Sequence, residues 1–388
     1  MKSGTSEQPH LVFYKRRQLK TMTTSHNMCN DHGGFLLDDL LSQFSSSSES
    51  AIINNPYQST FVTCNIIAML CFIISSFTGN FSQVDKLWSI VPAMYAWMCV
   101  TDTRTTLMAF LATLWSVRLT YNFYRRGGYN GLPFRGEEDY RWEILRRGTL
   151  GGWWTLLTNK FILGVFNLVF ISFFQNLLLL YIASPSVVAW SMAMKRTHCD
   201  NDEGVQNLSS LNALDGIAAT IFLFALCIEC MADNQQLRFQ NKKHAINSVS
   251  GTFASATKSL IAKSAENKDL VDGFCQSGLF AIVRKPNYAA EQLTWISYYF
   301  FSVAASAPAA WPQSQSQGTV LWVNWSMGGF ILLCLLFQGS GWLTEQISTS
   351  KYPAYRNYQR RVPLYMPKIT TLWNLLVGNG HEKGGKVQ

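Results

Sequence analysis

Long apolar stretches alternate with short polar and basic stretches along most of the chain. A helix needs about 20 mostly apolar residues to cross a membrane. Seven stretches reach or approach that length, at residues 60–79, 88–100, 105–124, 161–190, 211–231, 288–309 and 320–343. Their apolar runs are continuous, whereas a membrane barrel alternates apolar and polar positions. The pattern predicts an all-α, polytopic membrane bundle of about seven transmembrane helices.

Two of these stretches depart from a simple crossing. The stretch at 88–100 is short and carries Pro92. The stretch at 161–190 is longer than one crossing requires, so we expect a tilt or a break near Pro185.

The polar pattern divides the rest of the chain. Residues 1–58 are polar, with four serines in a row, and are expected to form a disordered N-terminal tail. The membrane domain is expected at 59–367, with a long cytosolic loop at 240–278. A C-terminal tail would follow at 368–388.

Composition supports a membrane protein. Only 14% of the residues are charged, against about 25% in a soluble domain, and this excludes a water-soluble enzyme. The net charge of +9 comes from Lys and Arg in loops beside the apolar stretches, so it indicates membrane orientation rather than nucleic-acid binding. Basic residues follow the third, fifth and seventh stretches. We therefore expect a cytosolic C-terminus and an N-terminus that is outside or lumenal.

Polar side chains within apolar helices are functional candidates because they are costly there. Glu229, Asp233 and Gln236 follow one another at steps of four and three, which places them on one helical face. Two carboxylates one turn apart repel each other unless they face a cavity, a cation or a ligand. The alternative is a solvated helix end.

The third stretch carries Trp115, Arg118 and Tyr121 at steps of three. An arginine deep in an apolar helix must pair or face water. Asp85 is its nearest expected counter-charge. The alternatives are an Arg118 side chain that snorkels to the basic loop and an Asp85 that only caps a helix.

A basic and polar segment, Arg284 to Glu291, opens the sixth stretch. Its cations lie beside a helix N-terminus, where a phosphate could dock, and Asn287 offers both a donor and an acceptor. Glu291, four residues on, shares that face. The alternative is an interfacial anchor with a capping asparagine. No P-loop, GxGxxG or HExxH motif occurs, so no Rossmann domain or metal site is expected.

Several ordered motifs resemble one known family. They are VDKLWSIVP at 84–92, LWSVRL at 114–119, GEEDYRWEILRR at 136–147, ADNQQLRF at 232–239, RKPNYAAE at 284–291 and KYPAYRNYQRRVP at 351–363. Together they are similar to the DUF1295 branch of the steroid 5-alpha-reductase family, over about residues 60–367.

The resemblance implies seven helices, a C-terminal half that encloses NADPH, and an endoplasmic-reticulum location. It implies hydride transfer to a carbon–carbon double bond conjugated to a carbonyl in a lipid or sterol-like substrate. The implied catalytic residues are Asp85, Arg118 and Tyr121, and Trp88 and Trp115 would contact substrate. The implied cofactor-binding residues are Glu229, Asp233, Gln236, Arg284, Lys285, Asn287, Tyr288, Glu291, Arg356 and Arg360.

The sequence also departs from that family. Lys285 replaces the usual histidine, Ala290 the usual glycine and Trp115 a substrate-contacting tyrosine. Two other classes stay open. One is a membrane methyltransferase that uses S-adenosylmethionine and shares the C-terminal motif. The other is a non-catalytic lipid-binding protein of the same fold.

Overall fold

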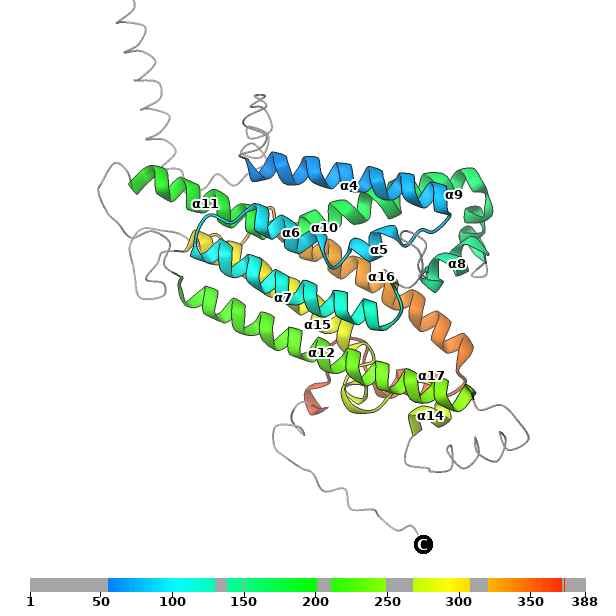
Figure 1. The fold of residues 1–388 in the computed structure, drawn as a ribbon. Coiled ribbons are helices and arrows are strands. Elements are labelled where there is room, and N and C mark those ends of the chain that lie inside the picture. The colour runs from blue at the N-terminus through cyan, green and yellow to red at the C-terminus, as the bar shows by residue number, and fades with distance from the viewer. Residues whose placement is uncertain are drawn as a thin grey trace, which may run out of the picture.

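The computed structural model describes residues 55–129, 138–148, 151–200, 211–248, 268–307, 320–371 and 373. Within these ranges every regular element is helical and no strand occurs, which confirms the all-α class (Figure 1). Residues 1–54 of the predicted N-terminal tail, residues 249–267 of the predicted loop at 240–278 and most of the C-terminal tail lie outside the described residues.

The first helix, α4, spans Pro56–Thr78 and has clear local start and stop signals. The side chain of Asn55 accepts the Tyr57 N–H at 3.0 Å, and proline occupies the first helical position. Gly79 ends the helix with a φ of 68°, a left-handed conformation that glycine adopts without strain.

The predicted helix at 88–100 is wrong as a single crossing. The chain forms two short helices instead, α5 (Gln83–Leu87) and α6 (Val91–Met98). At 1.5 Å per residue, α6 is only about 12 Å long, well below the thickness of a bilayer core. α7 then spans Thr103–Arg125 and starts at a capping box on Asp102.

The predicted break near Pro185 is confirmed. α9 (Lys160–Phe166), the π-helical η2 (Asn167–Phe174) and α10 (Gln175–Ala183) follow one another directly. The helix is interrupted at Ser184, and the next helix, α11 (Pro185–Asp200), begins at the proline. The basic segment before α9 contains α8 (Tyr140–Arg146) and the 3₁₀ helix η1 (Gly152–Thr158).

The C-terminal half contains the longest helix, α12, which spans Ala213–Ser248 and so continues past residue 240, where we predicted a loop. The remaining described elements are α14 (Lys268–Asp272), η3 (Gly278–Ala281), α15 (Pro286–Ser306), α16 (Met327–Lys351) and α17 (Tyr355–Arg361).

Fewer helices than the predicted seven are long and apolar enough to span a membrane. Four qualify among the described residues: Pro56–Thr78, Lys160–Ala183, Ala213–Ala245 and Met327–Lys351. α7 and α15 are long but more polar. α15 packs against α12, α11 and α16, and most of its residues are buried. A helix that is surrounded by protein needs less hydropathy than one that faces lipid, so a hydropathy criterion misses it.

Side-chain pairs show how the helices around α15 run. α7 and α12 are parallel, because Arg104 pairs with Asp215 at 2.8 Å near both starts and Arg118 pairs with Asp233 at 3.0 Å further along. α15 is antiparallel to α12, since Asn212 before α12 donates to the carbonyl of Ala304 near the end of α15 at 3.0 Å, and Thr294 nearer the start of α15 donates to Glu229 at 3.3 Å. The ends of α7 and α12 therefore meet the start of α15 at one end of the bundle (Figure 1).

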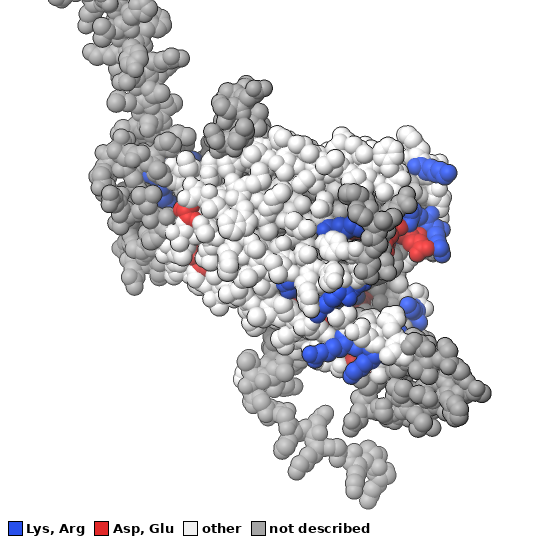
Figure 2. Space-filling view, in the orientation of Figure 1, with Lys and Arg blue, Asp and Glu red and all other residues white. Residues whose placement is uncertain are grey.

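Charge is distributed unevenly over the molecule. Figure 2 shows a largely uncharged surface along the bundle, with Lys and Arg concentrated toward the end where α7, α12 and α16 terminate. This end carries the basic residues that follow the third, fifth and seventh predicted stretches. Its residues also make the candidate site.

The contact between α10 and α16 depends on a glycine. Gly329 of α16 is buried, and a Cβ atom there would overlap the backbone carbonyl of Tyr181 in α10. A neighbouring backbone cannot move aside as a flexible side chain can. By contrast, a Cβ at Gly339, three turns on in the same helix, would meet no atom within 4 Å.

Gly329→Ala should therefore separate α10 from α16 and cost about 1–3 kcal/mol, the usual range for an overpacked core. Thermal unfolding of the purified protein in detergent should show a lower midpoint. Gly339→Ala is the matched control, and its higher helix propensity should leave the midpoint unchanged or raise it. Equal midpoints for the two variants would contradict the close approach.

Candidate functional site

A cluster of charged side chains joins α7, α12 and α15. The Arg118 guanidinium, 10% exposed, contacts three buried carboxylates: Glu229 at 2.7 Å, Asp233 at 3.0 Å and Glu291 at 3.2 Å. The 229–233 spacing places the first two on one face of α12, as the sequence predicts. Arg118 therefore pairs with side chains on two other helices and does not snorkel to the basic loop.

Glu291 is enclosed on all sides. Its Oε1 accepts the indole N–H groups of Trp115 at 3.0 Å and Trp295 at 2.9 Å, and its Oε2 faces Arg118. The two indole rings meet edge to face at 4.9 Å between centroids. Glu291 and Trp115, predicted to bind cofactor and substrate respectively, are thus bonded to each other inside the helix packing.

The cluster holds more carboxyl groups than cations. Three carboxylates face the single enclosed cation, Arg118, and Arg126, 42% exposed, adds a second contact to Asp233 at 3.3 Å. The Arg118 Nε–H has no hydrogen-bond partner among the described residues. Burying charged groups without matching partners makes folding less favourable, and such groups are concentrated at functional sites.

The predicted pairing of Arg118 with Asp85 is wrong, because Arg118 takes its partners from α12 and α15. Asp85 instead accepts the Trp142 indole N–H at 3.1 Å. Burial raises the pKa of the Asp85 carboxyl above its ordinary value, although Arg141 nearby opposes this. Arg141 is held in place by Asp139, at 2.8 Å, and donates to Ser340 of α16 at 3.1 Å.

Two other predicted site residues lie apart from the cluster. Tyr121 is 61% exposed, and its ring lies under the Arg125 guanidinium at 5.5 Å. In this conformation its hydroxyl does not approach the cluster. Trp88, at the end of α5, is partly buried and packs against the main core.

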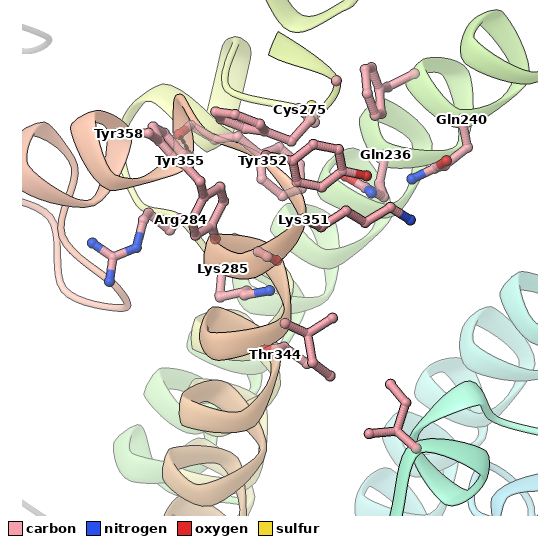
Figure 3. A pocket seen from close by; sticks show the side chains of 17 residues that line it. Gln236, Gln240, Cys275, Arg284, Lys285, Thr344, Lys351, Tyr352, Tyr355 and Tyr358 are labelled. Atoms are coloured by element: carbon pink, nitrogen blue, oxygen red, sulfur yellow. Dashed lines mark hydrogen bonds between the residues drawn. The ribbon is translucent and has the colours of Figure 1, made fainter. Parts of the chain in front are cut away.

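A cavity of about 460 Å³ opens at the same end of the bundle, between α12, the segment before α15, α16 and α17. Figure 3 shows Lys285, Lys351, Gln236 and Gln240 reaching it from three of these elements. Aromatic rings form much of the remaining wall. They are Phe239, Phe274, Phe280, Tyr352, Tyr355 and Tyr358.

Arg284 lines this cavity, but its guanidinium is already bonded and points away from Lys285 (Figure 3). Its Nε lies 2.9 Å from Glu345 of α16, and its Nη1 donates to the carbonyl of Gln359 at 3.0 Å. Tyr355 and Gln359 also donate to Glu345, at 2.6 and 2.9 Å. The predicted phosphate ligand is thus used to hold α17 against α16.

The other predicted cofactor residues divide between the wall of the cavity and the surface. Gln236 and Lys285 line the cavity. Arg356 and Arg360 are exposed on α17 and do not line it. Asn287, one turn before Glu291, is partly buried and does not line the cavity. Tyr288 packs edge to face on Phe337 at 4.8 Å.

Sequence reasoning missed Glu345, Trp295 and Cys275. Glu345 follows an apolar stretch, which is the same signal that indicated Glu229. Burial raises the pKa of the Cys275 thiol to about 12, so it lines the cavity as a neutral group. Among the residues that the structure describes, no group of His, Cys, Asp or Glu is arranged to hold a metal ion.

The model of one protein family matches this chain from residue 71 to residue 362. The family is DUF1295, described as a protein of unknown function. The chain belongs to the DUF1295 family. The match extends from α4 to the end of α17 and therefore includes the Arg118 cluster and the whole cavity.

A DUF1295 relative from Schizosaccharomyces pombe, Uncharacterized protein C594.04c, is 34% identical over 323 residues. The alignment covers 81% of this chain and 80% of the relative. No solved structure matches the chain.

Arg118 should be indispensable for the fold of this DUF1295 protein. Arg118→Met leaves three buried carboxylates without their cation and should cost about 3–5 kcal/mol. Arg126→Met removes an exposed partner of the same Asp233 and should cost less than about 1 kcal/mol. Thermal unfolding in detergent measures both, and similar losses would show that Arg118 is not the centre of the cluster.

Proposed function

We propose that this DUF1295 protein is a membrane-embedded, NADPH-dependent reductase. Its substrate would be a lipid or sterol-like molecule with a carbon–carbon double bond conjugated to a carbonyl. The observation that carries the proposal is the charge of the cavity. Lys285 and Lys351 line it, and no carboxylate is among the described lining residues. The charge of Arg284 in its wall is matched by Glu345.

That charge favours a polyanionic ligand. NADPH carries a diphosphate and a 2′-phosphate, and lysine ammonium groups bind phosphate well. S-adenosylmethionine carries a cationic sulfonium and an ammonium group, which lysines would repel. The glutamines at 236 and 240 and the aromatic side chains suit the ribose and the adenine, through hydrogen bonds and ring contacts.

The Arg118 cluster would define the other end of the ligand site. Asn287 offers a donor and an acceptor for a carboxamide, one turn from Glu291. Glu291 supports that position indirectly, because it fixes α15 to α7 through Trp115 and Arg118. A change at Glu291 would then displace Asn287, and small misplacements at a hydride-transfer site are costly.

When bound, NADPH would supply a hydride for the β-carbon of the substrate. A proton must also reach the α-carbon, and a hydrogen-bond donor must stabilise the negative charge that develops on the carbonyl oxygen. Asp85 suits this role when protonated, and burial favours its protonated form. The remaining candidates near the substrate are Trp88 and Trp115 as substrate contacts and the exposed Tyr121 as a second hydrogen-bond donor.

The proposal predicts that NADPH stabilises the purified protein in a thermal-shift titration. NADH should bind more weakly because it lacks the 2′-phosphate, and S-adenosylmethionine should have no effect. Lys285→Ala or Lys351→Ala should each weaken NADPH about tenfold, the equivalent of one charged hydrogen bond.

Lys242→Ala is the matched control, because Lys242 is an exposed cation near the end of α12 that does not line the cavity. Stabilisation by S-adenosylmethionine alone would favour a methyltransferase. Absence of any nucleotide effect would favour a non-catalytic lipid-binding protein.

A second prediction concerns Asp85. Asp85→Asn removes a proton that can be transferred while it keeps the shape of the side chain, so turnover should fall by 10²-fold or more, to order of magnitude, with NADPH affinity retained. Wild-type turnover should be present at low pH and decrease as pH rises through the raised pKa of Asp85. Full turnover in the variant on an enone substrate would reduce Asp85 to a structural role.

A further inference from the structure

The segment after α17 lies along the outside of the bundle. The carbonyls of Pro363 and Leu364 accept the backbone N–H groups of Arg284 and Lys285 at 2.8 and 3.1 Å. Tyr365 then reaches α16, where its hydroxyl donates to the carbonyl of Phe337 at 2.6 Å. The segment is therefore held at a defined level on a helix that is long and apolar enough to span a membrane.

Its level on α16 follows from the sequence of that helix. Phe337 ends the continuous apolar run of α16, because Gln338, Gly339 and Ser340 follow it. The Tyr365 hydroxyl is therefore bonded at the edge of the apolar part of the helix. Interfacial amphipathic segments insert to about 5–10 Å below the headgroup boundary. The segment is thus at the depth of such an anchor.

The side chains that follow Tyr365 are apolar and uncovered. Met366 is 83% exposed, Ile369 84% and Trp373 64%. Met366 precedes Pro367, and Ile369 and Trp373 lie one turn apart in the short helical segment that follows. A turn does form there, since the Thr371 N–H donates to Lys368 at 2.9 Å. Such large exposed apolar groups need a partner.

Basic side chains lie next to this apolar strip. Arg360 and Arg361 are exposed at the end of α17, and Lys368 is exposed within the segment. Lysine or arginine beside apolar and tryptophan side chains is the composition of membrane-surface anchors that prefer anionic lipid. The depth on α16, the exposed apolar side chains and the adjacent cations all fit the same partner, the surface of a lipid bilayer.

We infer that residues 363–371 and Trp373 form an interfacial membrane anchor. Met366, Ile369 and Trp373 insert beside α16 into the acyl–headgroup boundary of the leaflet at the basic end, and Arg360 and Arg361 attract an anionic lipid headgroup. The backbone bonds to Arg284 and Lys285 connect this anchor to the cavity wall. The inference concerns the membrane contact alone and holds whether or not NADPH is the ligand.

The experiment places a photo-crosslinking amino acid at Ile369 of the full chain in nanodiscs of phosphatidylcholine with phosphatidylserine. Illumination followed by mass spectrometry should detect lipid adducts as the main product. The control position is Val271 of α14, which is apolar and similarly exposed. The carbonyl of Gly273, two residues after Val271, accepts a hydrogen bond from the ammonium group of Lys243 in α12. Lys243 lies twelve residues, or about 18 Å, beyond Met231, where the apolar part of α12 ends. The probe at Val271 should give no lipid adduct above background.

The anionic preference has its own readout. Phosphatidylserine should be enriched in the adducts about fivefold over its mole fraction, and Arg360→Gln with Arg361→Gln should reduce that enrichment toward one. The inference is overturned if the probe at Ile369 gives no lipid adduct, or if it links two copies of the chain. If phosphatidylserine stays enriched in the double variant, Arg360 and Arg361 are not the residues that attract the anionic headgroup.

Discussion

The pairing of Arg118 with Glu229, Asp233 and Glu291 is the constraint on which the rest of the site depends. Ions inside an apolar bundle are stable only when each one finds its partners. Satisfying four of them from three helices fixes how α7, α12 and α15 are rotated about their axes. That rotation also determines where Gln236 and Asn287 point, since each lies one turn from a member of the cluster. The cavity and the cluster are therefore positioned by the same contacts.

What the sequence could predict follows from the range of each interaction. Periodicity is local, so it correctly placed Glu229 and Asp233 on one face and put a break near Pro185. Partner choice is not local. Arg118 lies 111 residues from Glu229 and 173 from Glu291 in the chain, so proximity in sequence favoured Asp85 incorrectly. Arg284 shows the same limit, because nothing near it in the sequence reveals that Glu345 occupies its guanidinium.

Fewer helices meet a hydropathy criterion for crossing than the seven predicted, for a related reason. A hydropathy window cannot distinguish a helix that faces lipid from one that is surrounded by other helices. α15 is lined with buried serines, tyrosines and a glutamate that pair within the bundle, which is possible only because its neighbours cover it. The stretch at 88–100 was apolar enough, yet Pro92 starts a new helix at α6 and leaves it too short to cross.

The two ion-pair sites on α7 differ in how well their charged groups are matched. Arg104 and Asp215 form a closed pair, with two bonds of 2.8 Å between one cation and one anion. That pair ties the starts of α7 and α12 together and leaves no charge over. About 20 Å further along α7, the Arg118 cluster holds a surplus of carboxylate and an unbonded Nε–H. A structural role alone would be met by a balanced pair like the first, at lower cost. The surplus of carboxyl groups lies at the end of the bundle that carries the cavity lined by Lys285 and Lys351, and unmatched buried groups of this kind are concentrated at functional sites.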